Sequence, residues 1–256
     1  MHHLPSPAQR RATGFTLMEI LVVIAIIMVL AVITLPVMNV IRTRANKVTA
    51  MNTMRSLGGA VGNYLSQNDN FLPPEDSSGI DTWTAAADPL NVNVWYNSLP
   101  KQMGMKTVGQ FASEPEKFYT KENLLFLPGA VYPDSTKKLV RPMFAIAINT
   151  KLQRKDASGA KKARMSDITK PERTVLFLEQ GLSSEKKLPV QPKYDGSPKG
   201  SAHSFVGRYS GQGVLTFCDG HAESMAVEDT MEVTGRFPFP PRDIIWCRTS
   251  DEDPNQ

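Results

Sequence analysis

The sequence predicts an α+β protein in which a long N-terminal helix precedes a group of short strands. Three observations favour this class. The nineteen residues from Ile20 to Met38 contain no charge, an apolar stripe at helical spacing continues after them, and short β-rich runs follow in the second half of the chain. We therefore expect a helix that is apolar all round at first and amphipathic later, followed by a sheet.

The composition supports a folded core and argues against nucleic-acid binding. Hydrophobic residues make up 41% of the chain, and 29 Lys and Arg against 25 Asp and Glu give a formal net charge of +4. The basic residues are scattered, apart from Lys pairs at 137–138, 161–162 and 186–187. Such small clusters are typical of solvated loops, so we expect no nucleic-acid partner.

The apolar run from Ile20 to Met38 is long enough to cross a membrane. As a helix it would extend roughly 28 Å, about the thickness of the hydrocarbon core of a bilayer. A secretory signal peptide has a shorter apolar region and a small-residue cleavage site after it, and neither fits here. The segment should stay with the protein, and a plain single-pass anchor remains one interpretation.

Glu19 lies immediately before this run, where the charge of an acidic side chain is unfavourable unless it is compensated. A charged group costs about 2.5–3.5 kcal/mol at the bilayer centre and less near the interface. If the chain is cut between Gly14 and Phe15, the new α-amino group is a cation close to Glu19. It could offset the carboxylate within the helix or in a neighbouring subunit.

The string Gly14-Phe15-Thr16-Leu17-Met18-Glu19, behind a leader with Arg10 and Arg11, resembles the prepilin signal of type IV pilins and type II secretion pseudopilins. The resemblance implies that a prepilin peptidase cuts between Gly14 and Phe15 and that Phe15 is N-methylated. It implies an assembly role for Glu19 and a helix kink at Pro36. Basic residues flank the apolar run on both sides, so only the resemblance predicts the orientation, with the leader in the cytoplasm.

The resemblance also implies a function, a location and partners. The function is that of a structural subunit, not an enzyme, assembled with other pilin-like subunits into a type II secretion or type IV pilus-like filament. The location is the bacterial inner membrane, with the C-terminal domain periplasmic or extracellular. The predicted regions are a leader at 1–14, a long helix at 15–66 with its membrane segment at 20–38, a variable insertion at 67–142 and a sheet region at 143–256.

The long helix is predicted to carry one apolar face beyond the membrane and to end near Ser66. The stripe consists of Ile41, Ala45, Val48, Met51, Met54, Leu57, Val61 and Tyr64. In type IV pilin-like folds this half of the helix packs on an antiparallel sheet. Predicted strands are residues 143–149, 174–179, 214–218 and 222–227. Asp219-Gly220 predicts a tight hairpin turn with positive φ at both central positions.

A second resemblance concerns the closing segments of a pseudopilin-related family. The matching residues are Ala147-Ile148-Asn149, Lys170 to Phe177 with the "TVLF" string, and Phe217-Cys218-Asp219-Gly220-His221. Many relatives have an Arg-His pair before the closing hairpin, whereas here Arg208 precedes Tyr209.

Several other interpretations remain open from the residues. His203, Asp219 and His221 could serve an anchored metal-dependent hydrolase, and Asp219 is a candidate calcium ligand, although turn geometry explains Asp219 and Gly220 without a metal. Outside the cytoplasm the two cysteines, Cys218 and Cys247, could form one disulfide, or Cys218 could be a small buried residue.

A further alternative is a membrane-anchored exocytoplasmic binding module that uses the same signal but stays in the membrane. Its ligand would be held by aromatic side chains such as Trp83, Trp95 and Tyr96.

Overall fold

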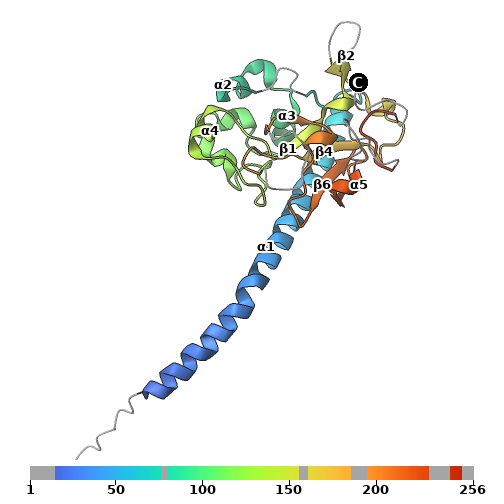
Figure 1. The fold of residues 1–256 in the computed structure, drawn as a ribbon. Helices are drawn as coiled ribbons and strands as arrows, with labels where there is room; N and C mark the ends of the chain where they lie inside the picture. The colour runs from blue at the N-terminus through green and yellow to red at the C-terminus, as the bar shows by residue number, and fades with distance from the viewer. Residues whose placement is uncertain (1–14, 76–79, 156–160, 186–194, 231–242, 250–256) are drawn as a thin grey trace, which may run out of the picture. The chain divides into compact units, whose positions relative to one another are not determined.

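The computed structural model describes residues 15–75, 80–155, 161–185, 195–230 and 243–249 (Figure 1). The chain forms two compact units, Met1–Arg42 and Thr43–Gln256, and each is described by itself. Helix α1, Leu17–Gln67, belongs to both units, and its bounds lie close to the predicted 15–66. In the first unit the described residues are helical from Leu17 onward, and the helix continues through residue 36.

In the second unit, α1 is buried along one face that begins at Ala50. The face consists of Ala50, Met54, Leu57, Ala60, Val61 and Tyr64, each at most 8% exposed. The steps of three and four residues keep these side chains on one side of the helix. The N-terminal part of the predicted stripe differs, since Ile41 and Val48 are 54% and 60% exposed. The core of the second unit therefore covers α1 only from about its middle.

The central sheet has five strands in the order β5-β1-β4-β6-β7. Their bounds are Lys199–Gly200 for β5, Ile146–Asn149 for β1, Val175–Glu179 for β4, Gln212–Phe217 for β6 and Ala222–Ala226 for β7. The four predicted strands pair antiparallel, but β5 joins β1 in parallel. The sheet is therefore mixed, whereas the sequence predicted an antiparallel one. The prediction missed β5 because a strand of two residues is too short to show an alternating pattern. A separate hairpin pairs β2, Arg154–Lys155, with β3, Lys161–Lys162.

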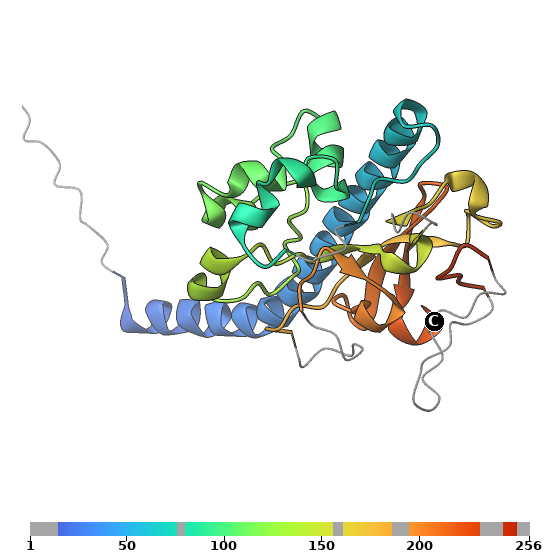
Figure 2. The ribbon, with the colours of Figure 1, turned by 90° about the horizontal axis from the view of Figure 1, so that it is seen from above.

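Both faces of the sheet are covered, which explains why the inner strands β1 and β4 lack a polar face. One face packs on the outer part of α1 and on the short helices that follow it (Figure 2). The other face packs on a second cluster that includes Phe205, Val227, Ile244 and Trp246. Every residue of β4 is buried, and a register shift between Val175 and Phe177 places the adjacent Leu176 and Phe177 in the same cluster.

The segment between α1 and the sheet contains short helices. They are α2 (Trp83–Ala86), η1 (Pro89–Asn91), α3 (Trp95–Gln102), η2 (Val108–Phe111), η3 (Pro115–Tyr119) and α4 (Ser135–Val140). The remaining helices are η4 (Thr150–Leu152), η5 (Met165–Asp167), η6 (Ala202–Ser204) and α5 (Val227–Thr230).

The aromatic residues proposed to hold a ligand are core residues instead. Trp95 and Tyr96 are fully buried, and Trp83 is 6% exposed. The indole N–H of Trp95 donates to the Pro198 carbonyl at 3.0 Å, and that of Trp83 donates to Lys138 at 2.7 Å. Their rings pack edge-on or tilted against other buried rings, as aromatic cores do. The binding module built on these three side chains is therefore wrong.

The turn between β6 and β7 lies at the predicted position but has a different geometry. Gly220 has φ +92°, whereas Asp219 is not among the described residues with positive φ. The Gly220 N–H donates to the Phe217 carbonyl at 2.9 Å, and the Phe217 N–H donates to the His221 carbonyl at 2.9 Å. This pattern is a three-residue loop with a bulge at glycine, not the two-residue turn expected.

Glycine at the helix allows this turn to approach α1. A Cβ added to Gly58 would lie 2.5 Å from the carbonyl oxygen of Gly220 and 2.9 Å from its Cα. Next to this contact, the hydroxyl of Thr216 donates to the Met54 carbonyl of α1 at 3.0 Å. Helix and hairpin are thus in backbone contact.

A buried ionic cluster lies where β4 ends. The Arg208 guanidinium donates twice to Glu185, at 2.9 and 2.8 Å, and once to Glu179 at 3.3 Å. Glu179 also accepts from the Tyr209 hydroxyl at 2.9 Å and the Val214 N–H at 2.8 Å. Burial raises the pKa of Glu179, while Arg208 and the other donors oppose that shift. This cluster ties together β4, β6 and two loops.

Candidate functional site

The start of α1 is organised around Thr16 and Glu19. Thr16 directly precedes the helix, and its backbone N–H and hydroxyl donate to Glu19 Oε2 at 2.8 and 2.9 Å. In return, the Glu19 N–H donates to the Thr16 hydroxyl at 3.3 Å. This is a capping box, which satisfies backbone donors that no helical carbonyl reaches. The pair therefore fixes where the helix begins and holds an anion at its positive end.

The predicted cleavage point lies immediately before this capped end. Phe15 is outside the helix and 82% exposed, while Gly14 lies outside the described residues. Phe15 and Glu19 are thus four residues apart in the sequence, and Glu19 lies in the first turn of α1. An α-amino group created at Phe15 would be close in sequence to the only acidic residue in the first turn of α1.

The apolar part of α1 exposes its side chains on all sides within its own unit. Exposed fractions in the described membrane segment range from 46% at Ile20 to 73% at Val32. This helix is long and apolar enough to cross a membrane. Its thirteen Ile, Leu and Val side chains contribute about −4 to −8 kcal/mol to insertion, which exceeds the cost of one acid near the interface. Such a surface requires lipid or other apolar helices around it.

Pro36 lies inside this segment, and the kink predicted there stays a prediction. Proline has no N–H to donate to the carbonyl one turn earlier, so the helical hydrogen-bond ladder is interrupted at that position. Close by, the Thr34 hydroxyl donates to the carbonyls of Leu30 and Ala31, at 2.9 and 3.3 Å. This contact satisfies the polar group of Thr34 inside an apolar segment.

The residues considered for metal chemistry are only partly brought together. Asp219 Oδ1 lies 2.6 Å from Nδ1 of His221 and accepts the His221 N–H at 3.0 Å. The His221 ring stacks on Phe217 with centroids 4.4 Å apart. Within the described ranges, no group of three or more His, Cys, Asp or Glu side chains is placed to hold a metal, so His203 does not complete such a site. Calcium binding at Asp219 stays a prediction.

The two cysteines are buried thiols rather than the disulfide considered from the sequence. The Cys218 N–H donates to the Thr174 carbonyl, while Val175 and Ile245 pair on the opposite side of the same segment. Cys218 and Ile245 therefore bond to opposite sides of this segment, and the structure has no disulfide between Cys218 and Cys247. Burial raises the pKa of the Cys218 thiol, which keeps it protonated.

Comparison with known families identifies the N-terminal segment. Residues 9–35 match the prokaryotic N-terminal methylation motif, which is the prepilin-type signal of type IV pilins and pseudopilins. The match includes Gly14, Phe15 and Glu19 and ends one residue before Pro36. No curated protein and no solved structure matches the chain. The resemblance of the closing hairpin to a pseudopilin-related family therefore has no support beyond the residues themselves.

Proposed function

We propose that this chain is a pseudopilin-class subunit that is processed by a prepilin peptidase and assembled into a type II secretion or type IV pilus-like filament. The observation that carries the proposal is the methylation motif at residues 9–35, which includes the start of a long helix with exposed apolar side chains. Proteins with this motif are structural subunits rather than enzymes. The fold, a long helix followed by a small sheet, is consistent with a pilin-like subunit.

Processing would prepare the helix end for assembly. Cleavage behind Gly14 leaves the Phe15 ammonium beside a carboxylate that the capping box holds in place. Both capping hydrogen bonds use Glu19 Oε2, and among the described residues no donor reaches Oε1. That oxygen can accept the methylated ammonium of an adjacent subunit, and the contact would set the axial register between neighbours.

During assembly, the apolar surfaces of the helices would lose their contacts with lipid and gain contacts with the helices of neighbouring subunits. Before assembly the helix lies in the inner membrane with its leader in the cytoplasm and the sheet domain on the far side. In the filament the same side chains pack against those of neighbouring subunits, so apolar surface stays away from water throughout. The chain needs no catalytic group for this role.

Replacing Glu19 tests the assembly step. Glu19→Ala should be cleaved like the wild-type protein but should enter shear-released filaments more than about tenfold less, because an ammonium would be buried without its partner. Glu19→Gln separates charge from capping, because glutamine keeps the capping box. We expect it to fail similarly, whereas Glu116→Ala, at an exposed position in the second unit, should assemble normally. Normal filament yield from both Glu19 variants would contradict the proposed role.

A further inference from the structure

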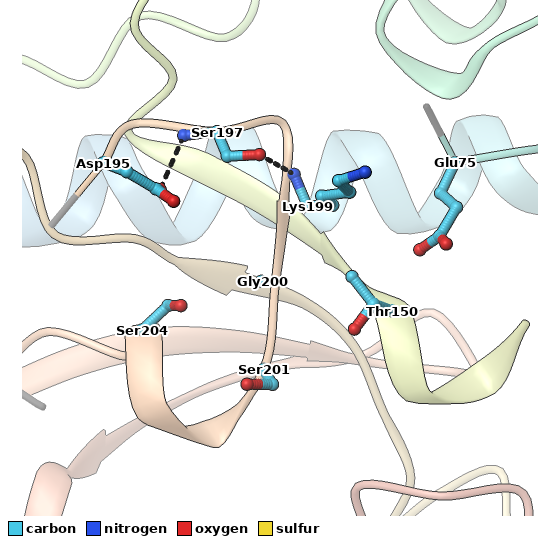
Figure 3. Close-up of a pocket in the computed structure, with 8 residues that line it drawn as sticks. All are labelled: Glu75, Thr150, Asp195, Ser197, Lys199, Gly200, Ser201 and Ser204. Atoms are coloured by element: carbon cyan, nitrogen blue, oxygen red, sulfur yellow. Dashed lines mark hydrogen bonds between the residues drawn. The ribbon is translucent and has the colours of Figure 1, made fainter. Parts of the chain in front are cut away.

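A polar cavity of about 270 Å³ opens beside β5, at one edge of the sheet (Figure 3). Its wall consists of hydroxyl, carboxylate and ammonium groups around Gly200, and no aromatic or aliphatic side chain is among the described residues that line it. The polar residues that matter here are Glu75, Thr150, Asp195, Lys199, Ser201 and Ser204. They come from three separate segments of the chain that meet at β5.

Three hydroxyls in this wall have no hydrogen-bond partner within the described part of the chain. They belong to Thr150, Ser201 and Ser204, and Ser204 is only 2% exposed. None of the three is a buried polar atom without a partner, so each hydroxyl reaches the open space of the cavity, where it can bond to water or to a ligand. In Figure 3 the hydroxyls of Thr150 and Ser204 point into the space beside Gly200 from opposite sides. The cavity thus presents unused donors and acceptors to whatever fills it.

The carboxylate of Asp195 is held in a fixed orientation at the same cavity. Its Oδ1 accepts from the side-chain amide of Gln180 at 2.9 Å and from the Ser197 N–H at 3.0 Å. Gln180 is fully buried in the strand-end region of the sheet, so this support is rigid. The second oxygen of Asp195 stays available. An exposed acid positioned by a buried amide is typical of a binding site built in advance.

Two more charged groups determine which ligand the cavity accepts. Glu75 is 5% exposed and adds a second carboxylate, while Lys199 adds one ammonium. With Asp195 the wall contains two carboxylates and one ammonium, and the exposed carboxylate of Asp195 repels an anion placed in the cavity. The ammonium in the wall disfavours a calcium site, which needs about six to eight oxygens around one point. An apolar ligand would leave the hydroxyls unsatisfied.

We propose that this cavity binds a small neutral polyhydroxylated molecule, a single sugar ring that is either free or the terminal unit of a glycan. Each sugar hydroxyl can donate to a carboxylate and accept from a serine, a threonine or Lys199, which matches the mixture of groups in the wall. The volume is close to the lower end of the range for ligand sites, about 300–1,000 Å³, so it fits one ring rather than a chain of them. The sugar site is independent of filament assembly.

Ligand-observed NMR on the full-length protein in detergent micelles tests this proposal. The probes are glucose, galactose, mannose and N-acetylglucosamine, with glucuronate and calcium chloride as charged comparisons. At least one neutral sugar should give saturable binding, and glucuronate should bind more weakly. Methyl glycosides distinguish the two sources of ligand, because only a site that admits the end of a glycan accepts the added methyl group. Loss of binding on methylation would assign a free sugar instead.

Variants assign any binding to this cavity. Ser204→Ala should raise the Kd for the preferred sugar about fivefold, which is the usual effect of one lost hydrogen bond. Asp195→Asn should weaken it further, and Ser113→Ala, at an exposed serine outside the cavity, should not change it. The proposal is overturned if no neutral sugar binds, if calcium binds there instead, or if the cavity variants bind like the wild type. Circular dichroism of each variant confirms that a loss is not unfolding.

Discussion

At the residue scale, the role of each acidic side chain in this protein depends on its burial and its hydrogen-bond partners. Glu19 is exposed within its unit yet forms two hydrogen bonds that define the start of α1. Glu179 and Glu185 are instead buried on either side of one arginine. Sequence alone located Glu19, because its position before an apolar run is unusual. It could not locate the buried cluster, because Arg208 and its partners come from separate loops and a strand end with no common spacing.

The first residue-scale prediction concerns Arg208. Replacing it with methionine keeps the apolar stem but leaves the carboxylates of Glu179 and Glu185 buried without their cation. Breaking a buried ion pair in this way costs about 3–5 kcal/mol of unfolding free energy. The measurement is urea denaturation of the full chain in micelles. Arg55→Met, at an exposed position of α1, should stay within about 0.5 kcal/mol of wild type. Equal stability of the two variants would contradict the buried ionic role.

The second residue-scale prediction concerns pH. Burial raises the pKa of Glu179 above its ordinary value of 4.5, so the folded state binds its proton more readily than the unfolded state does. The contribution of Glu179 to stability is therefore complete below about pH 4.5 and is lost as pH rises through the folded pKa. The difference in unfolding free energy between wild type and Glu179→Gln should change across this window. Parallel stability curves for the two proteins from about pH 4 to about pH 8 would show that Glu179 does not titrate in this way.

At the scale of elements, hydrophobic spacing predicted long or repeated features and missed short ones. The steps of three and four in Met54, Leu57, Val61 and Tyr64 predicted the buried face of α1 correctly. The strand β5 was missed because Lys199-Gly200 is held by pairing with β1, not by its own composition. The hairpin was located from Asp219-Gly220, but its turn type depends on Cys218 also being in the loop, which the dipeptide does not reveal.

The contact between α1 and this hairpin gives the element-scale prediction. Gly58→Ala should destabilise the protein by about 1–3 kcal/mol, because the new methyl group would lie 2.5 Å from the Gly220 carbonyl oxygen and would force the backbone of the turn or of the helix to shift. Gly59→Ala is the matched control, because an added Cβ there meets nothing within 4 Å. It should stabilise the helix by up to about 1 kcal/mol. Thermal denaturation distinguishes the two, and a stabilising Gly58→Ala would argue against the close contact.

At the scale of the whole molecule, the two units differ in how much of their apolar surface they cover themselves. The second unit covers both faces of its sheet with its own helices and loops. The first unit has no such cover, since the described residues from Phe15 to Val40 include an almost unbroken run of exposed apolar side chains. That surface must be covered by something outside the unit, and the methylation motif at its start suggests a membrane; the filament is our proposal for what covers it later. The exposed apolar helix was predictable from sequence because its length and composition are sufficient signals, and its insertion in a membrane stays a prediction.

The most direct test of a prepilin-type subunit is the intact mass and N-terminal peptide of the protein isolated from its native membrane. We expect a mature chain that begins at N-methylated Phe15, with residues 1–14 removed and Glu19 retained in its first turn. A chain that still begins at Met1, or one cut after the apolar run, would contradict processing by a prepilin peptidase. The first forty residues would then be an ordinary anchor or signal sequence.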